Sequence, residues 1–130
     1  MSTMKARRCV GAVGLAGLTF LAGLAAANAQ DRTAVQRGKA KFEHSCAPCH
    51  GPGRGDDGRE QLPGTEALQI KYRGALPAVL EERSDLMAPA LKLFVRNGTW
   101  SMPPFRPTEV TDAEIEDIAA YLAETSKRPQ

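Results

Sequence analysis

Two cysteines that are two residues apart and followed at once by a histidine, Cys46-Ala47-Pro48-Cys49-His50, constrain this chain more than any other feature. This spacing occurs in thioredoxin-like redox pairs, structural disulfides, zinc sites and sites of covalent haem attachment. A zinc site needs about four ligands, but beyond the first thirty residues the chain has one other histidine and no other cysteine. A redox pair would need a βαβ context and has no use for the histidine. The motif therefore predicts one c-type haem per chain.

The same motif assigns a role to each of its polar residues. Cys46 and Cys49 can each add across one vinyl group of the porphyrin, and their spacing lets both sulfurs reach the same edge of the ring. His50 then lies beneath the ring, where its imidazole can bind the iron as the proximal axial ligand. We therefore expect two covalent thioethers and one iron–histidine bond within five residues.

The N-terminal residues have the pattern of a secretory signal peptide. Basic residues without an acid precede an uncharged, weakly apolar run over 10–26, and the Ala-Asn-Ala sequence at 27–29 fits a cleavage site. A retained membrane anchor is the alternative, although the many glycines and alanines make the run weakly hydrophobic. We expect 1–29 to be a signal peptide and 30–130 to be one monohaem domain, which lies in the bacterial periplasm and is free of the membrane.

The net charge of the chain indicates which kinds of partner it can bind. The chain has 17 basic and 15 acidic residues, and removal of the three basic leader residues leaves 14 basic residues against the same 15 acids. No basic run or basic patch with interleaved aromatic residues remains, which argues against nucleic acid and anionic membranes as partners. A domain of about 100 residues has a marginal core, so a buried porphyrin would add apolar surface that seven aromatic residues cannot supply.

Apolar periodicity predicts an all-α domain without strands, a small helical fold wrapped around one haem. The first helix is expected over 33–45, with Gly38 and Phe42 on one face.

A last helix opens with a Thr111 to Glu114 capping box. It should bury Ile115, Ile118, Ala119 and Leu122 and turn Glu116, Asp117 and Glu124 to water.

Three further segments lie between these helices. A short helix is expected between Pro89 and Gly98, and another over 76–82. Residues 51–64 are rich in glycine and proline and read as an irregular loop on the proximal side of the haem. Calcium binding by this loop is the alternative, but Asp56 and Asp57 lack the spaced oxygen ligands that calcium needs.

An electron carrier needs a second axial ligand, and only two methionines lie beyond the leader. Met102 follows Gly98 and precedes Pro103, and a residue before proline favours an extended conformation. This would place its thioether on a braced, non-helical segment able to lie across the ring. Met87 precedes a helix and reads as a core or loop residue. Met102 is therefore the expected distal ligand, and a site that is open or filled otherwise remains the alternative.

Together, the haem motif, the first helix, the Met102-Pro103 segment and the closing helix resemble class I c-type cytochromes across nearly the whole mature chain. The run 95–98 with Met102, Pro103 and Phe105 resembles, more narrowly, the cytochrome subunit of p-cresol methylhydroxylase and related flavocytochromes. The first resemblance implies thioethers at Cys46 and Cys49, proximal His50 and distal Met102.

The resemblance to class I cytochromes also implies how the terminal helices pack. Gly38 and Phe42 should meet Tyr121 and Leu122 where these helices cross. The carbonyl of Pro63 would be the acceptor for the proximal imidazole, which fixes its tautomer and makes the histidine a better ligand.

Haem propionates need donors or cations when they are buried. Arg73, Arg96 and Trp100 are the candidates, together with Tyr72, each against an ordinary surface or core role. Ala47, Pro48, Pro103 and Pro104 could form an apolar docking patch around the exposed haem edge.

These observations predict a one-electron carrier and not an enzyme. Its partners would be redox proteins: a donor dehydrogenase, with this chain either free or its cytochrome subunit beside a flavin- or quinone-containing partner, and a respiratory acceptor. His/Met ligation tends to raise the potential, which suits that position. The alternative function is a haem protein with an open sixth position that binds or reduces a small ligand.

Overall fold

The computed structural model describes residues 32–127, so the predicted signal peptide at 1–29 lies outside the described residues. Within that range the chain is helical and has no strand, and its only strand-like contact is an isolated bridge between Thr99 and Met102. The predicted all-α class is therefore confirmed.

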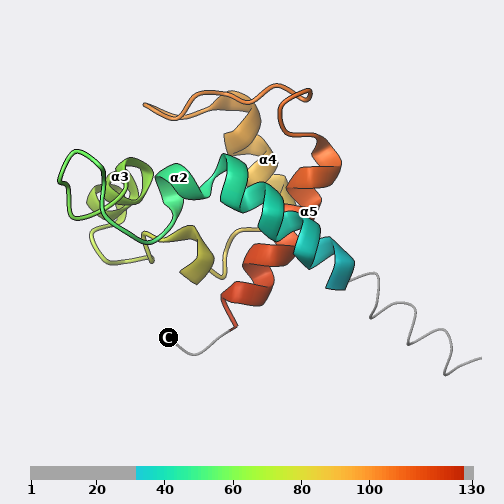
Figure 1. Ribbon diagram of the computed structural model, residues 1–130, viewed down its shortest axis with the longest axis horizontal. Helices are drawn as coiled ribbons and strands as arrows, with labels where there is room; N and C mark the ends of the chain where they lie inside the picture. The colour runs from blue at the N-terminus through green and yellow to red at the C-terminus, as the bar shows by residue number, and fades with distance from the viewer. Residues whose placement is uncertain (1–31, 128–130) are drawn as a thin grey trace, which may run out of the picture. The chain divides into compact units, whose positions relative to one another are not determined.

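Figure 1 shows the order and arrangement of the elements. They are a first helix over 32–45, α2 (Ala47–His50), α3 (Pro63–Tyr72), a short 3-10 turn (Leu80–Glu82), α4 (Ala88–Asn97) and α5 (Asp112–Thr125). The first helix crosses α5, and the segment between α4 and α5 runs along the upper edge of this view.

The crossing of the first helix and α5 depends on Gly38, but this residue meets Asp117 and Ile118, one turn before the predicted Tyr121 and Leu122. A Cβ atom on Gly38 would lie 1.9 Å from the carbonyl oxygen of Asp117 and 2.9 Å from the backbone nitrogen of Ile118. The close neighbour of Gly38 is thus the backbone of α5 itself. One turn further along, the rings of Phe42 and Tyr121 pack with centroids 5.5 Å apart. Both residues are buried in one core with Ile115 and Leu122.

One prediction about this crossing is wrong. Asp117 was expected to face water, but its side chain is only 14% exposed. Arg37 donates to both of its carboxylate oxygens, at 2.7 and 2.8 Å. The close approach that Gly38 permits brings the first helix over this side of α5, so Asp117 is covered and paired.

The capping box that opens α5 is confirmed. The backbone N–H of Glu114 donates to the Thr111 hydroxyl at 3.2 Å, and the N–H of Thr111 donates to the Glu114 carboxylate at 2.7 Å. The same carboxylate pairs with Lys41 of the first helix. The Thr111 N–H and Lys41 together lower the pKa of Glu114 to about 2.

The middle of the chain differs from the prediction in two places. Residues 51–64 are not irregular to the end, because α3 begins at Pro63. A proline followed by a glycine is typical of a turn, so the sequence suggests a loop here. Proline also suits the first position of a helix, because its fixed φ is helical, and Pro63 has that role in α3. The helix predicted over 76–82 is only the 3-10 turn Leu80–Glu82. Leu76 precedes Pro77, and a residue before proline disfavours the helical conformation.

Replacing Gly38 by alanine tests the crossing. Helix propensity alone would stabilise the protein by about 1 kcal/mol. We expect the opposite sign, a loss of about 1–3 kcal/mol, because the new methyl group meets the α5 backbone. Thermal unfolding of the holoprotein measures the effect. Gln36→Ala, on the exposed face of the same helix, is the control and should change stability by less than about 0.5 kcal/mol. A more stable Gly38→Ala protein would contradict the account.

Candidate haem site

The cysteine–histidine motif folds as one helical turn that continues the first helix. The backbone N–H of Cys46 donates to Phe42 at 2.8 Å, and that of His50 donates to Cys46 at 2.9 Å. Both cysteines are free thiols. Burial raises the pKa of the Cys46 thiol to about 11, whereas Cys49 is exposed. Within residues 32–127, no three side chains of His, Cys, Asp or Glu lie close enough together to hold a metal ion.

The imidazole of His50 is held against the start of α3. A Cβ atom on Gly64 would lie 2.7 Å from Cε1 and 2.8 Å from Nδ1 of the ring, so only glycine fits beside it. Burial lowers the pKa of His50, which favours the neutral form that binds metals. Its Nδ1 is buried and has no hydrogen-bond partner. The hydrogen bond expected from Nδ1 to Pro63 is therefore not present.

Thr65 is a site residue that the sequence interpretation missed. Its side chain is buried, 2% exposed, and its hydroxyl donates to the carbonyl of Gly51 at 2.9 Å. Gly51 in turn closes the end of α2 through its N–H to Ala47. Thr65 therefore ties α3 to the end of the haem motif. Its role follows from α3, and only Pro63 at the first helical position signals that helix in the sequence.

The predicted distal ligand, Met102, lies on a short loop that we call the methionine loop, residues 98–105. The loop starts at Gly98, which ends α4 with φ 65° and lies so close to the loop that a Cβ atom would be 2.6 Å from the Met102 carbonyl oxygen. Thr99 and Met102 exchange two backbone hydrogen bonds of 3.0 and 2.9 Å. Met102 is half-buried, whereas Met87 precedes α4 and is 68% exposed. The loop thus holds Met102 as braced, non-helical backbone.

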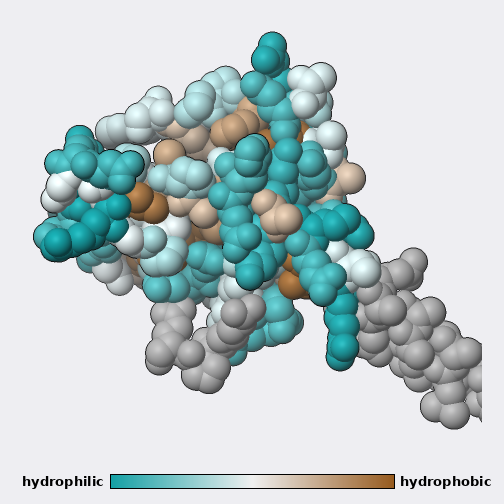
Figure 2. Space-filling view, in the orientation of Figure 1, coloured by the Kyte–Doolittle hydropathy of each residue, from teal (hydrophilic) through white to brown (hydrophobic). Residues whose placement is uncertain are grey.

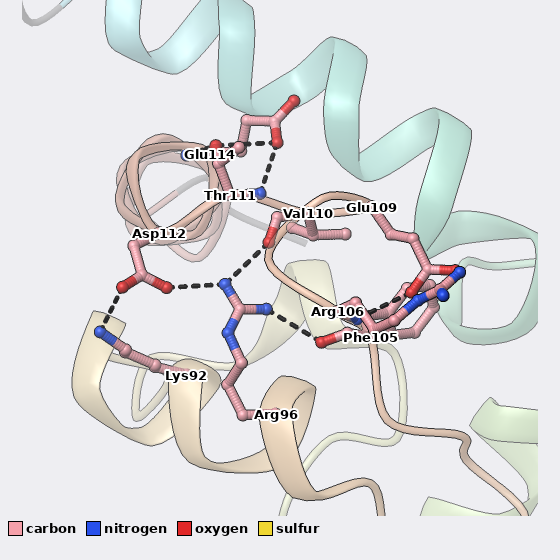
Figure 3. A network of polar contacts seen from close by, with 9 residues as sticks. All are labelled: Lys92, Arg96, Phe105, Arg106, Glu109, Val110, Thr111, Asp112 and Glu114. Atoms are coloured by element: carbon pink, nitrogen blue, oxygen red, sulfur yellow. Dashed lines mark hydrogen bonds and ion pairs between the residues drawn. The ribbon is translucent and has the colours of Figure 1, made fainter.

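The far end of the methionine loop returns to α4 (Figure 3). The Phe105 N–H donates to the Val95 carbonyl at 2.7 Å. Arg96 donates to the carbonyl of Phe105 at 3.1 Å, to that of Val110 at 2.7 Å and to the Asp112 carboxylate at 2.6 Å. All three hydrogen-bond partners of the Arg96 guanidinium belong to the protein. The expected contact of Arg96 with a haem propionate stays a prediction.

The other propionate candidates are not brought together. Arg73 is exposed at the end of α3, with φ 50°, and Trp100 is fully exposed at the turn of the methionine loop, with φ 52°. Tyr72 lies instead beneath Arg83, whose guanidinium carbon is 4.8 Å from the ring centroid. Arg83 is buried and pairs with Asp85, and the sequence interpretation did not single it out.

The residues present fit a haem. Two unpaired thiols and an imidazole lie on one turn, and the buried Nδ1 of that imidazole has no hydrogen-bond partner. Figure 2 shows hydrophobic residues between the methionine loop and the α2–α3 end, whereas the first helix is covered with hydrophilic ones. Large apolar side chains are exposed on α3, α4 and the loops beside them: Ile70, Met87, Leu93, Phe94 and Trp100.

Comparison with known proteins supports this assignment. The sequence profile of the family described as cytochrome c oxidase, cbb3-type, subunit III matches residues 33–122. A cytochrome c6 of Cyanidioschyzon merolae is 29% identical over 94 residues, which are 72% of this chain and 77% of the relative. A cytochrome c6 of Synechocystis is 26% identical over 125 residues, which are 95% of this chain and 93% of the relative. No solved structure matches significantly.

None of these matches names a flavocytochrome, so the narrower resemblance to the p-cresol methylhydroxylase subunit gains no support from them.

The helices described over residues 32–127 are all too short or too polar to span a bilayer. The family profile covers the first helix, the haem motif, the methionine loop and most of α5. The chain therefore belongs to the cbb3-type cytochrome c oxidase subunit III family and is a class I c-type cytochrome, an electron-transfer protein that carries one covalently bound haem.

Proposed function

We propose that this cytochrome is a periplasmic one-electron carrier whose iron is bound by His50 on the proximal side and Met102 on the distal side. The observation that carries the proposal is the folding of Cys46, Cys49 and His50 into one turn closed by α3, with both thiols unpaired. The haem supplies a metal that changes between Fe(III) and Fe(II). The residues of this chain hold that metal and limit its movement.

On the proximal side, the chain positions the ligand through helices. The first helix continues into α2 and orients the motif, while Gly64 and Thr65 of α3 close its other side. Burial lowers the pKa of His50, which favours the neutral imidazole that binds a metal. Because both neighbouring elements are helical and packed, we expect the imidazole to keep one orientation in both oxidation states.

On the distal side, the thioether of Met102, on its braced loop, would be the second ligand that the chain supplies to the iron. Sulfur is a soft ligand that favours Fe(II) and so raises the potential. A filled position also excludes oxygen and other small ligands. This suits a carrier that takes electrons from a dehydrogenase, as a free protein or as its cytochrome subunit, and passes them to a respiratory acceptor.

We place electron transfer to and from partner proteins at the exposed edge of the haem. Pro48, Pro103 and Pro104, which are all exposed, would surround that edge. These residues carry no charge, and a mature chain of near-zero net charge would steer its partners weakly. The predicted signal peptide at 1–29 would deliver the chain to the periplasm, where covalent haem attachment takes place in bacteria.

Substitution of the two methionines tests the distal ligand. Met102→Ala should abolish the far-red charge-transfer band of the ferric protein, lower the potential and admit cyanide or carbon monoxide, since the sulfur no longer blocks the iron. Met87→Ala is the matched control and should leave the spectrum intact. Loss of the band in Met87→Ala but not in Met102→Ala would reassign the ligand. Rapid cyanide binding by the wild type would favour the open-site alternative.

Gly64→Ala tests the proximal side. The new methyl group would lie 2.7 Å from both the Cys49 carbonyl oxygen and Cε1 of His50, so the imidazole must turn or α3 must move. We expect altered EPR g-values of the ferric protein, because these report the orientation of the axial ligands, and a lower thermal midpoint. Ala67→Ser, at an exposed position of α3, is the control. Identical g-values and stability in Gly64→Ala would contradict the proposed packing.

A charge at the exposed edge tests the docking surface. Ala47 packs against the core, so Pro104→Glu is the cleaner change. Electron transfer from the periplasmic dehydrogenase fraction that reduces the wild type should slow about tenfold, since redox interfaces are small and one unpaired charge weakens them. Gln36→Glu lies about 15 Å along the first helix from the haem motif and should have little effect. Equal stopped-flow rates for both variants and the wild type would place docking on another face.

A further inference from the structure

We infer that Arg96 is a positioning residue that holds the methionine loop closed and so determines how readily Met102 leaves the iron. This inference rests on the proposed ligation by Met102 and goes beyond it, since it concerns what controls the bond. It assigns to Arg96 a role in the distal site without contact to the haem.

The two ends of the methionine loop are held by different means. At its start, the absence of a side chain on Gly98 lets the chain fold back until the Met102 carbonyl approaches it. The paired hydrogen bonds between Thr99 and Met102 fix this turn internally. Neither contact ties the loop to another element, so the start of the loop could swing away as a unit about Gly98.

The middle of the loop cannot supply a second anchor through its backbone donors. Residues 103 and 104 are both proline, and proline has no N–H to donate. The next residue with a donor is Phe105, which bonds to Val95 at 2.7 Å. Closure of the loop on α4 therefore depends on what holds Phe105 in place.

Arg96 is the side chain that hydrogen-bonds to the backbone carbonyl of Phe105, whose ring also packs against the core. The Arg96 side chain is 18% exposed. Its guanidinium donates to the carbonyls of Phe105 and Val110, in the segment between α4 and α5, and to the carboxylate of Asp112 at the start of α5 (Figure 3). Hydrogen bonds from a charged donor are about twice as strong as neutral ones. Removal of the guanidinium would also leave two carbonyls without this partner.

Lys92 provides an internal comparison. It lies one turn before Arg96 on α4 and also pairs with Asp112, at 2.5 Å. Unlike Arg96, it has no hydrogen bond or ion pair to the methionine loop. Asp112 thus lies between two cations, which lower its pKa. If the pairing of α4 with Asp112 mattered by itself, Lys92 and Arg96 would be equivalent. If closure of the loop matters, only Arg96 should affect Met102.

The test measures cyanide binding to the ferric holoprotein. In this substitution the iron–sulfur bond to Met102 breaks, the cyanide carbon binds in its place, the proton of hydrogen cyanide goes to solvent and the iron stays ferric. Cyanide can enter only after the thioether has left, so the limiting rate at saturating cyanide reports loop opening. Arg96→Met keeps the stem of the side chain and should raise that rate about tenfold to a hundredfold, the range for the one charged hydrogen bond that Arg96 makes to the loop.

Two further variants separate positioning from general stability. Arg96→Lys keeps the charge and one donor group and should give an intermediate rate, and it serves as the test variant if Arg96→Met does not fold. Lys92→Met should match the wild type. In Arg96→Met, the charge-transfer band should also be lost on heating well before the helices unfold, which a merely structural role would not cause.

The outcomes distinguish this inference from the proposed function. If Met102→Ala keeps the charge-transfer band, the ligand assignment fails and the inference fails with it. If Met102→Ala loses the band but the Arg96 variants bind cyanide at the wild-type rate, the ligand stands and the role of Arg96 is wrong. An equal rise in Lys92→Met would also overturn it, because the effect would then come from Asp112.

Discussion

The fixed position of α2 is the constraint on which the rest of the site depends. This helix has only four residues, far too few to be stable by themselves, so its geometry is imposed by its neighbours. The first helix runs into it from one side, and α3 closes the other side through Gly64 and Thr65. The two thiols and the imidazole are thereby held on one turn.

The two sides of the proposed iron site are built by different physical means. The proximal residue His50 is held by packed helices, which move little. The distal residue Met102 is held by a loop that returns to the helix it left and is fixed there through Phe105 and Arg96. A rigid proximal side and a loop held by a few strong hydrogen bonds would keep the site closed in both oxidation states, while the distal bond remains the one that can open.

Features with a local signal could be predicted from the sequence. The haem motif, the Thr111 capping box and the glycine at the helix crossing each have such a signal, and the structure contains all three. Features that depend on tertiary contacts could not. The Arg96 network joins residues far apart in the chain, and α3 lacks a clear apolar stripe, so Thr65 went unnoticed. Asp117 was misjudged because helix periodicity does not show which neighbour covers a polar face.

The most direct test of this account is a crystal structure of the holoprotein with anomalous diffraction recorded at the iron edge. The account predicts one iron, with thioethers at Cys46 and Cys49, Nε2 of His50 on one side and the sulfur of Met102 on the other. The methionine loop should be closed on α4 through Arg96. An iron without a sulfur ligand, or one bound by Met87, would contradict the central claim.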